Sequence, residues 1–232
     1  MLFHNVNELE VVLVHSLLQR AVSCANAIDQ ASADEPFVSN TQTSDASSAN
    51  AAPQHQVFTV AKSRHSVQTA SGLTLTPTWA FMGAPPLDVL IVPSGAGLPL
   101  RDKDKQLFSY LEQKSQQVEV VVGLGSGVAV LGECGLLRGL NVSAPAHLHN
   151  YLEQYEILQA NEDVLTVVEV QGDARADSNT TQPDTVARAP QVWSAPQIWS
   201  ARGGLSSSEL TAALIESLFG AYIKDTVMSK LS

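Results

Sequence analysis

Three regularly spaced glycines mark the stretch of this chain where catalytic chemistry is expected. Gly123, Gly125 and Gly127 lie where a valine-rich run passes directly into an apolar helix. A strand that turns abruptly into a helix needs small residues there, because a Cβ atom would clash. The spacing has the steric frame of a nucleophile elbow, whose central residue is held in strained geometry above the sheet. The central residue here is Gly125, which has no side chain that can attack a substrate.

Ser126 and His147 are the candidate catalytic residues that remain near this turn. A serine hydroxyl becomes a nucleophile only beside a base, and His147 or His149 would have to supply one. The glycine frame is centred on Gly125 and not on Ser126, so a pocket-lining or oxyanion-stabilising role is the favoured interpretation of the serine. Two histidines at the start of a surface helix are more typical of a solvated position than of a catalytic base.

A second group of small residues follows another apolar run, Leu87–Val92. A nearly continuous apolar run favours a strand covered on both faces, and hence a parallel sheet. Ligands of open α/β sheets collect at the carboxyl ends of such strands. The two turns therefore predict one ligand-binding edge, made of Ser94, Gly95, Gly125, Ser126 and Gly127, with Gly97 close by.

Neither a cofactor nor a metal is expected at this edge. A dinucleotide-binding Gly-x-Gly-x-x-Gly motif starting at Gly123 would need a glycine where Val128 stands. A phosphate-binding loop would need a nearby lysine, and none is present. The histidines are scattered without metal-ligand spacing, and Cys24 and Cys134 each lie in an apolar helical stretch, where a cysteine is usually an inert small hydrophobe.

Strands and helices alternate along the chain, which predicts a doubly wound α/β fold with a mainly parallel sheet. We expect one domain over residues 1–232, with polar loop insertions at about 32–54 and 172–190. A serine N-cap followed by Glu209 predicts a capping box at the start of the last helix. The other expected elements are strands at Leu9–Val14, Val57–Ala61, Asn141–Ala146 and Val164–Val170, a hairpin or extended excursion at Ser66–Thr76, and helices at Leu17–Ile28, Asp104–Lys114 and His147–Leu158.

Charge and composition exclude several classes of partner. The formal net charge is −10, with 13 basic and 23 acidic residues, so direct nucleic-acid binding is disfavoured. Two cysteines do not make a disulfide framework and suit a reducing compartment. The sequence shows no signal peptide and no apolar run approaching the ~20 residues of a membrane span. We therefore expect a cytoplasmic chain with no membrane partner.

Several stretches, taken in chain order, resemble the ThiJ/PfpI family of the class I glutamine-amidotransferase-like superfamily. The resemblance is strongest to the branch that contains isonitrile hydratases and the sensor domains of AraC-type regulators. It implies a flavodoxin-like three-layer sandwich and a homodimer. The stretches that carry it are Thr69–Pro77, Ala84–Pro93 with Gly95 and Gly97, Gly135–Gly139, and Ser200–Leu210.

The chain departs from the family pattern at three places that carry chemistry. Gly125 occupies the position of the family's elbow cysteine. The family's acidic residue after the first strand, which meets that cysteine, is expected to be missing, because His15–Arg20 stands in place of the motif. Ala144-Pro145-Ala146 replaces a Thr-His-Trp found in many members, with His147 beyond it.

These losses predict a catalytically silent domain that binds a small molecule or a protein partner, with a regulatory role among the open hypotheses. The alternative is a hydratase or amidase-type hydrolase of altered mechanism, which would use Ser126 with a histidine. A sensor role without direct DNA binding would require a partner protein.

Overall fold

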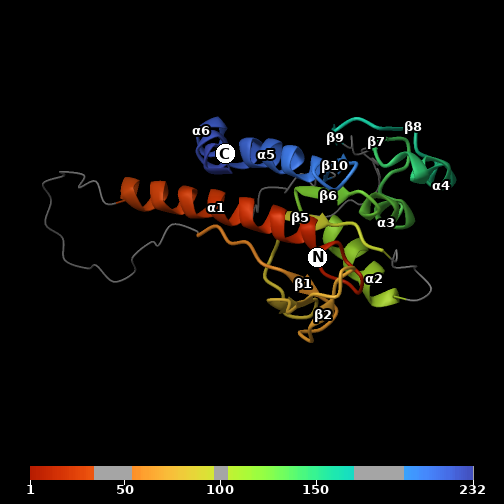
Figure 1. Cartoon of the computed structure of the whole chain (residues 1–232), viewed down its shortest axis with the longest axis horizontal. Coiled ribbons are helices and arrows are strands. Elements are labelled where there is room, and N and C mark those ends of the chain that lie inside the picture. The colour runs from red at the N-terminus through yellow and green to blue at the C-terminus, as the bar shows by residue number, and fades with distance from the viewer. Residues whose placement is uncertain (34–53, 97–103, 170–195, 232) are drawn as a thin grey trace, which may run out of the picture.

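A four-stranded sheet forms the centre of the chain (Figure 1). The computed structural model describes residues 1–33, 54–96, 104–169 and 196–231. The order is β5 (Val89–Val92), β6 (Val120–Leu124), β10 (Gln197–Ala201) and β9 (Leu165–Glu169). The first three strands are mutually parallel and β9 is antiparallel to β10. The predicted doubly wound, mainly parallel α/β fold is confirmed.

Helices cover both faces of this sheet, because alternate residues of its strands point in opposite directions. On one face Val120, Val122 and Leu124 pack against α1 (Glu8–Ala33), α5 (Ser206–Phe219) and α6 (Ala221–Met228). On the other face Val121 packs with Leu90 and with α2 (Lys105–Ser115) and α3 (Gly127–Glu133). Every residue of β6 is buried, so this strand is the core of a three-layer sandwich.

Small two-stranded pairings complete the fold. β1 (Val60–Ala61) pairs with β4 (Trp79–Ala80), and β7 (Asn141–Ser143) pairs with β8 (Gln159–Asn161). β2 (Val67–Gln68) and β3 (Thr74–Leu75) form an antiparallel hairpin, the first of the two forms expected for this segment, in which Gly72 has φ +92°. A left-handed turn position of this kind favours glycine.

The first helix replaces a predicted strand. α1 runs without a break from Glu8, so the strand expected at Leu9–Val14 is wrong, whereas the helix expected at Leu17–Ile28 lies within α1. The Asn7 side chain accepts a hydrogen bond from the Leu9 N–H at 3.0 Å and caps the first turn. The valines and leucines of this run fit the periodicity of a strand as well as that of a helix. The buried positions continue at helical spacing through Leu17 and Ala21, which favours the helix.

α1 also corrects the expectation about apolar runs. Residues 8–31 form a helix that is long and apolar enough to cross a membrane, which the sequence was expected to lack. One face of the helix is buried in the domain through Val14, Leu17, Leu18 and Ala21. A core helix of a soluble domain has this same composition, so the feature is weak evidence for a span.

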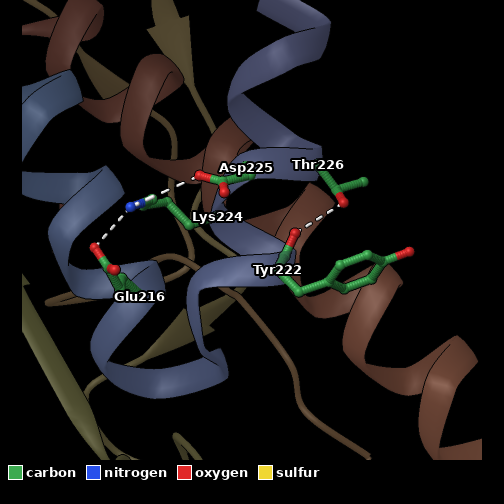
Figure 2. A network of polar contacts seen from close by, with 5 residues as sticks. All are labelled: Glu216, Tyr222, Lys224, Asp225 and Thr226. Carbon is green, nitrogen blue, oxygen red and sulfur yellow. Dashed lines mark hydrogen bonds and ion pairs between the residues drawn. The ribbon is translucent and has the colours of Figure 1, made fainter.

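The last helical region differs from its prediction in two ways. Ser206 does not cap α5, because the N-cap residue is Leu205 and the Ser206 hydroxyl instead donates to Gly203 O at 2.8 Å. The expected capping box is therefore wrong. The chain also breaks at Gly220, which separates α5 from α6. Figure 2 shows how Lys224 spans this break, with its ammonium 2.8 Å from Glu216.

Other helices and strands begin or end at residues different from those predicted. The helix expected at His147–Leu158 is divided into η1 (Ala146–Leu148), α4 (His149–Leu152) and η2 (Glu153–Tyr155). The chain leaves the helical path at Glu156, where φ is +55°. The strand expected at Val57–Ala61 is shortened to β1, and a final turn, η3, covers Ser229–Leu231. Of the two predicted insertions, residues 34–53 and 172–190 lie outside the described residues.

Candidate functional site

The turn between β6 and α3 is centred on Gly125. Its φ of +52° is left-handed, a conformation that glycine adopts without steric cost. The Gly125 N–H donates to Ala201 O at 2.9 Å, which ties the turn to β10. A Cβ atom on Gly125 would lie 3.0 Å from Ser94 Cβ and 3.2 Å from Arg202 O. The position that would carry a nucleophile is therefore both without a side chain and crowded.

The two flanking glycines are required by close packing rather than by φ. A Cβ atom on Gly127 would overlap the carbonyl oxygen of Val92, and one on Gly123 would lie 2.9 Å from Leu131 Cδ1. The start of α3 therefore rests directly on the end of β5. This contact brings the two predicted small-residue turns together at one edge of the sheet.

The hydroxyl of Ser126 is committed to the backbone of Gly95. Its oxygen accepts a hydrogen bond from the Gly95 N–H at 3.0 Å and its proton is donated to Gly95 O at 3.2 Å. Gly95 itself admits no side chain, because a Cβ atom there would lie 2.6 Å from the Phe3 ring. Within the described part of the chain, Ser126 has neither a histidine nor a carboxylate as a hydrogen-bond partner. Ser126 thus joins the two turns and is not oriented by a base.

The histidines proposed as bases lie elsewhere. His147 is exposed on η1. His149 is half-buried, and its Nε2 lies 3.0 Å from the carbonyl oxygen of Ala144. The structure therefore does not assemble Ser126 and His147 into a serine–histidine pair.

A buried carboxylate, Glu10, lies beside the turn and corrects the expectation that the acidic residue is missing. Glu10 is only 1% exposed. Its Oε2 accepts from the Ser94 N–H and its Oε1 from the Gly204 N–H, each at 2.7 Å. A Cβ atom on Gly203 would lie 2.6 Å from Glu10 Oε1 and 2.8 Å from Gly125 Cα, so carboxylate and elbow are neighbours.

Glu10, Gly203 and Gly204 were not identified as site residues from the sequence. The two glycines have φ values of +85° and +60°, and they bring the chain after β10 to the carboxylate. The usable signal for Glu10 was a lone acidic residue within an apolar run that includes Val14 and Leu17, since a carboxylate on a buried face needs partners.

The cavity beside this carboxylate is small. Its volume is about 70 Å³, and its walls include Glu10, His15, Pro93 and Leu124. Sites for drug-sized ligands usually occupy ~300–1,000 Å³. The space beside Glu10 therefore fits a few water molecules rather than an organic substrate.

Ser94, after β5, is hydrogen-bonded to Asn7 at the start of α1. Its Oγ accepts from the Asn7 side-chain amide at 3.3 Å and its carbonyl oxygen accepts from the Asn7 N–H at 2.8 Å. Ser94, Gly95, Gly125, Ser126 and Gly127 thus do meet at one edge, whereas Gly97 lies outside the described residues. Within the described residues no group of three metal-ligating side chains is placed to hold an ion.

Comparisons with known proteins give one sequence relative and several structural neighbours. No family model matches the sequence. A stretch of 100 residues is 35% identical to an isonitrile hydratase from Pseudomonas putida, and it covers 43% of this chain and 44% of that enzyme. The aligned stretch thus spans less than half of the relative.

Two solved structures illustrate the likeness of fold. A ThiJ/PfpI family protein from Pseudomonas syringae superposes with a TM-score of 0.67 at 14% identity, over 99% of this chain and 72% of that one. An AraC family transcriptional regulator from Pseudomonas putida gives a TM-score of 0.61 at 16% identity, over 99% and 95% of the two chains.

Proposed function

We propose that the chain is a catalytically silent member of the ThiJ/PfpI family that binds a small molecule or another protein, a proposal that its likeness to an isonitrile hydratase and to the fold of two solved structures supports. One observation carries the proposal: the hydroxyl of Ser126 and the carboxylate of Glu10, which lie beside the elbow, are both hydrogen-bonded to backbone groups of the fold. Gly125 offers no nucleophile, Ser126 is held by Gly95, and Glu10 is held by Ser94 and Gly204. Neither of these two side chains is therefore free to act as a nucleophile or a base in the described structure.

A regulatory role is the form of binding that the neighbours favour. One structural neighbour is a transcriptional regulator, and this chain carries a net charge of −10, which opposes direct contact with DNA. We propose a cytoplasmic sensor that acts as a homodimer and passes its signal to a partner protein. Retention of a DNA duplex by the purified chain at physiological salt would contradict this part of the proposal.

Replacement of Ser126 by alanine tests the alternative serine enzyme. We expect Ser126→Ala to lower the free energy of unfolding by about 1–2 kcal/mol, because two hydrogen bonds to Gly95 are lost. We expect no hydration of an isonitrile above the buffer blank by either the wild type or the variant. Urea denaturation and a chromatographic assay of the formamide product are the two measurements.

Ser208→Ala is the matched control for this experiment. Ser208 is half-buried, and its hydroxyl donates to Leu205 O at 2.7 Å in a solvent-exposed hydrogen bond in the first turn of α5. Its loss should change stability by less than about 0.5 kcal/mol. If the wild type hydrates the isonitrile and Ser126→Ala alone abolishes this reaction, the serine enzyme is correct and the silent domain is not.

Replacement of Gly125 by cysteine tests whether the elbow keeps its frame. We expect Gly125→Cys to fold but to lose about 1–3 kcal/mol, because a left-handed φ costs a non-glycine residue ~1–2 kcal/mol and Cβ would crowd Ser94. The thiol should react with iodoacetamide faster than the half-buried Cys24 and Cys134 of the wild type. Peptide mapping by mass spectrometry after timed alkylation measures this.

The double variant Gly125→Cys/Ser94→Gly separates the two costs. Removal of Ser94 Cβ should recover the steric part of the loss while leaving the part due to φ. A cysteine at position 125 that alkylates no faster than the two native thiols would show that the turn does not present its central residue. The correspondence with the family's elbow would then be wrong.

A further inference from the structure

A cavity of about 300 Å³ lies between α1 and the C-terminal helical region. Its lining residues on α1 begin nine residues after Glu10, roughly 14 Å along the helix from the elbow. Its volume reaches the range of ligand sites, ~300–1,000 Å³, which the space beside Glu10 does not. The walls are formed by Gln19, Arg20, Ser23 and Cys24 of α1, Thr226 and Val227 of α6, and Lys230 of η3.

Helical spacing places these residues on the facing sides of the two helices. Arg20 and Cys24 are four residues apart, as are Thr226 and Lys230, so each pair shares one helix face. α1 and α6 pack against each other (Figure 1). Val227 is 1% exposed and belongs to the core that joins them. It therefore contributes a buried apolar wall, whereas Arg20 and Lys230 are exposed and reach solvent.

The cavity is positively charged although the chain is acidic. The chain has 23 acidic and 13 basic residues, yet among the described residues two basic side chains and no acidic one line this cavity. Neither Arg20 nor Lys230 takes part in an ion pair within the described part of the chain. Lys224, by contrast, lies 2.8 Å from Glu216. The two cations of the cavity can therefore accept an anionic ligand as their partner.

The two hydroxyl groups of the cavity do not donate to a ligand in this arrangement. The Ser23 hydroxyl donates to Gln19 O at 2.8 Å, and the Thr226 hydroxyl donates to Tyr222 O at 2.8 Å (Figure 2). Both hydroxyls thus present only acceptor lone pairs to the cavity. The strong donors are the two cations, and the guanidinium fork of Arg20 matches the geometry of a carboxylate or a phosphate.

We propose that the cavity between α1 and α6 binds a small organic anion, which carries a carboxylate or phosphate group on a short apolar body. The anionic group pairs with Arg20 and Lys230, and the apolar body packs against Val227 and the Cys24 thiol. This site gives the small molecule of the proposed function a place that the elbow does not offer, and in that respect it rests on the proposed function.

The test uses Cys24 as a reporter, because its thiol lines the cavity. Cys134, at the end of α3, is the internal control. The full chain is alkylated with iodoacetamide at constant ionic strength, with rising benzoate, phenyl phosphate or benzamide, and peptide mapping by mass spectrometry gives the rate at each cysteine. We expect the acids to slow Cys24 alone. Benzamide has nearly the same shape but no charge, so it should need at least about tenfold higher concentration.

The two acids distinguish the two anionic groups, since the one that protects Cys24 at lower concentration identifies the preferred group. Equal protection by benzoate, phenyl phosphate and benzamide would overturn the proposal, because the charge would then have no role. Equal protection of Cys24 and Cys134 would also overturn it, because the effect would not be local to the cavity.

Variants of the two cations test the recognition directly. Arg20→Gln and Lys230→Gln, each compared with itself in the absence of acid, should raise the protecting concentration of the preferred acid at least about threefold. Arg64→Gln, which is exposed in the loop between β1 and β2, is the control of equal charge change and should leave this concentration unaltered. An equal loss in Arg64→Gln and Arg20→Gln would reduce the effect to general attraction by the chain's charge and would reject the site.

The midpoint of thermal unfolding keeps the test decisive if Cys24 reacts too slowly to be timed. A ligand that binds only the folded chain raises this midpoint, so the preferred acid should raise it in the wild type, less in Arg20→Gln, and benzamide should not. Neither protection nor a raised midpoint would reject the site.

The isonitrile assay separates this proposal from the proposed function. A chain that binds the acid but also hydrates an isonitrile would keep the site and refute catalytic silence. A chain that hydrates no isonitrile and binds neither acid would refute the site alone.

Discussion

Replacement of Glu10 by alanine is expected to destabilise the chain by about 3 kcal/mol or more. The side chain is 1% exposed and accepts two hydrogen bonds of 2.7 Å, from the Ser94 and Gly204 N–H groups. A hydrogen bond to a charged acceptor contributes roughly 1.5–3 kcal/mol, and its loss leaves a buried donor without a partner. Urea denaturation at pH 7, followed by circular dichroism, measures the change.

Glu10→Gln distinguishes the charge from the shape. The amide keeps the volume but presents an NH₂ group to one of the two N–H donors, so at most one of the hydrogen bonds survives. We expect the free energy of unfolding to fall by less than in Glu10→Ala, but by well more than the error of the measurement.

Glu8→Ala is the matched control on the same turn of α1. Glu8 also accepts from a backbone N–H, that of Ser71, but at 3.4 Å and on the surface. Its removal should leave the unfolding midpoint unchanged. Equal effects at the two positions would show that Glu10 does not hold the elbow, the turn after β5 and the turn after β10 together.

The sequence marks Glu10 as an acidic residue within an apolar run, but it does not identify the partners of its carboxylate. Its partners Ser94 and Gly204 lie 84 and 194 residues away, and a local pattern carries no information about contacts at such separations. A strand at Leu9–Val14 would place the acidic partner at His15–Arg20, which contains no acidic residue. Because this segment is a helix, the acidic residue lies in its first turn.

The elbow, by contrast, was predictable because its cause is local. The β-branched run fixes β6, and the glycines that follow are demanded by contacts with residues close in sequence or on the adjoining strand, such as Leu131 and Val92. The helix at α2 was predicted for a similar reason. Asp104 caps its first turn through the Leu107 N–H, and Leu107, Phe108 and Leu111 are buried at helical spacing.

The central strand β10 escaped prediction because its residues lack the usual strand signal. Gln197–Ala201 contains polar and small residues, yet four of its five residues are buried between β6 and β9. Ser200 is tolerated there because its hydroxyl accepts from the Ser143 N–H at 2.9 Å. Tertiary context, not propensity, places this strand.

The pH dependence of stability is the second large effect that we expect. Desolvation lowers the pKa of the Met1 amine from 8.0 to about 5 in the folded chain. Between these values the unfolded chain binds a proton that the folded chain does not, so stability must rise with pH. The free energy of unfolding should increase by roughly 4 kcal/mol in total from pH 5 to pH 8, at about 1.4 kcal/mol per pH unit.

The contribution of the Met1 amine to this pH dependence must be distinguished from that of His15. The pKa of His15 is also lowered, mainly by burial and secondly by the charge at the N-terminus. That shift acts in the same direction, because a histidine that protonates less readily when folded also adds stability as pH rises. His15→Asn removes this contribution while the amine keeps its own. Urea midpoints from pH 5 to pH 8.5 should therefore keep most of their slope in His15→Asn.

N-terminal acetylation should remove that remaining slope, because the acetylated chain has no proton to bind at Met1 in either state. It should also make the chain more stable than the wild type at pH 5.5, where the free amine opposes folding most strongly, and nearly equal to it at pH 8.5. A slope that persists after acetylation would place the titrating group elsewhere. The Met1 amine would then be solvated in the folded chain and not desolvated beside the carbonyl oxygen of Ile91.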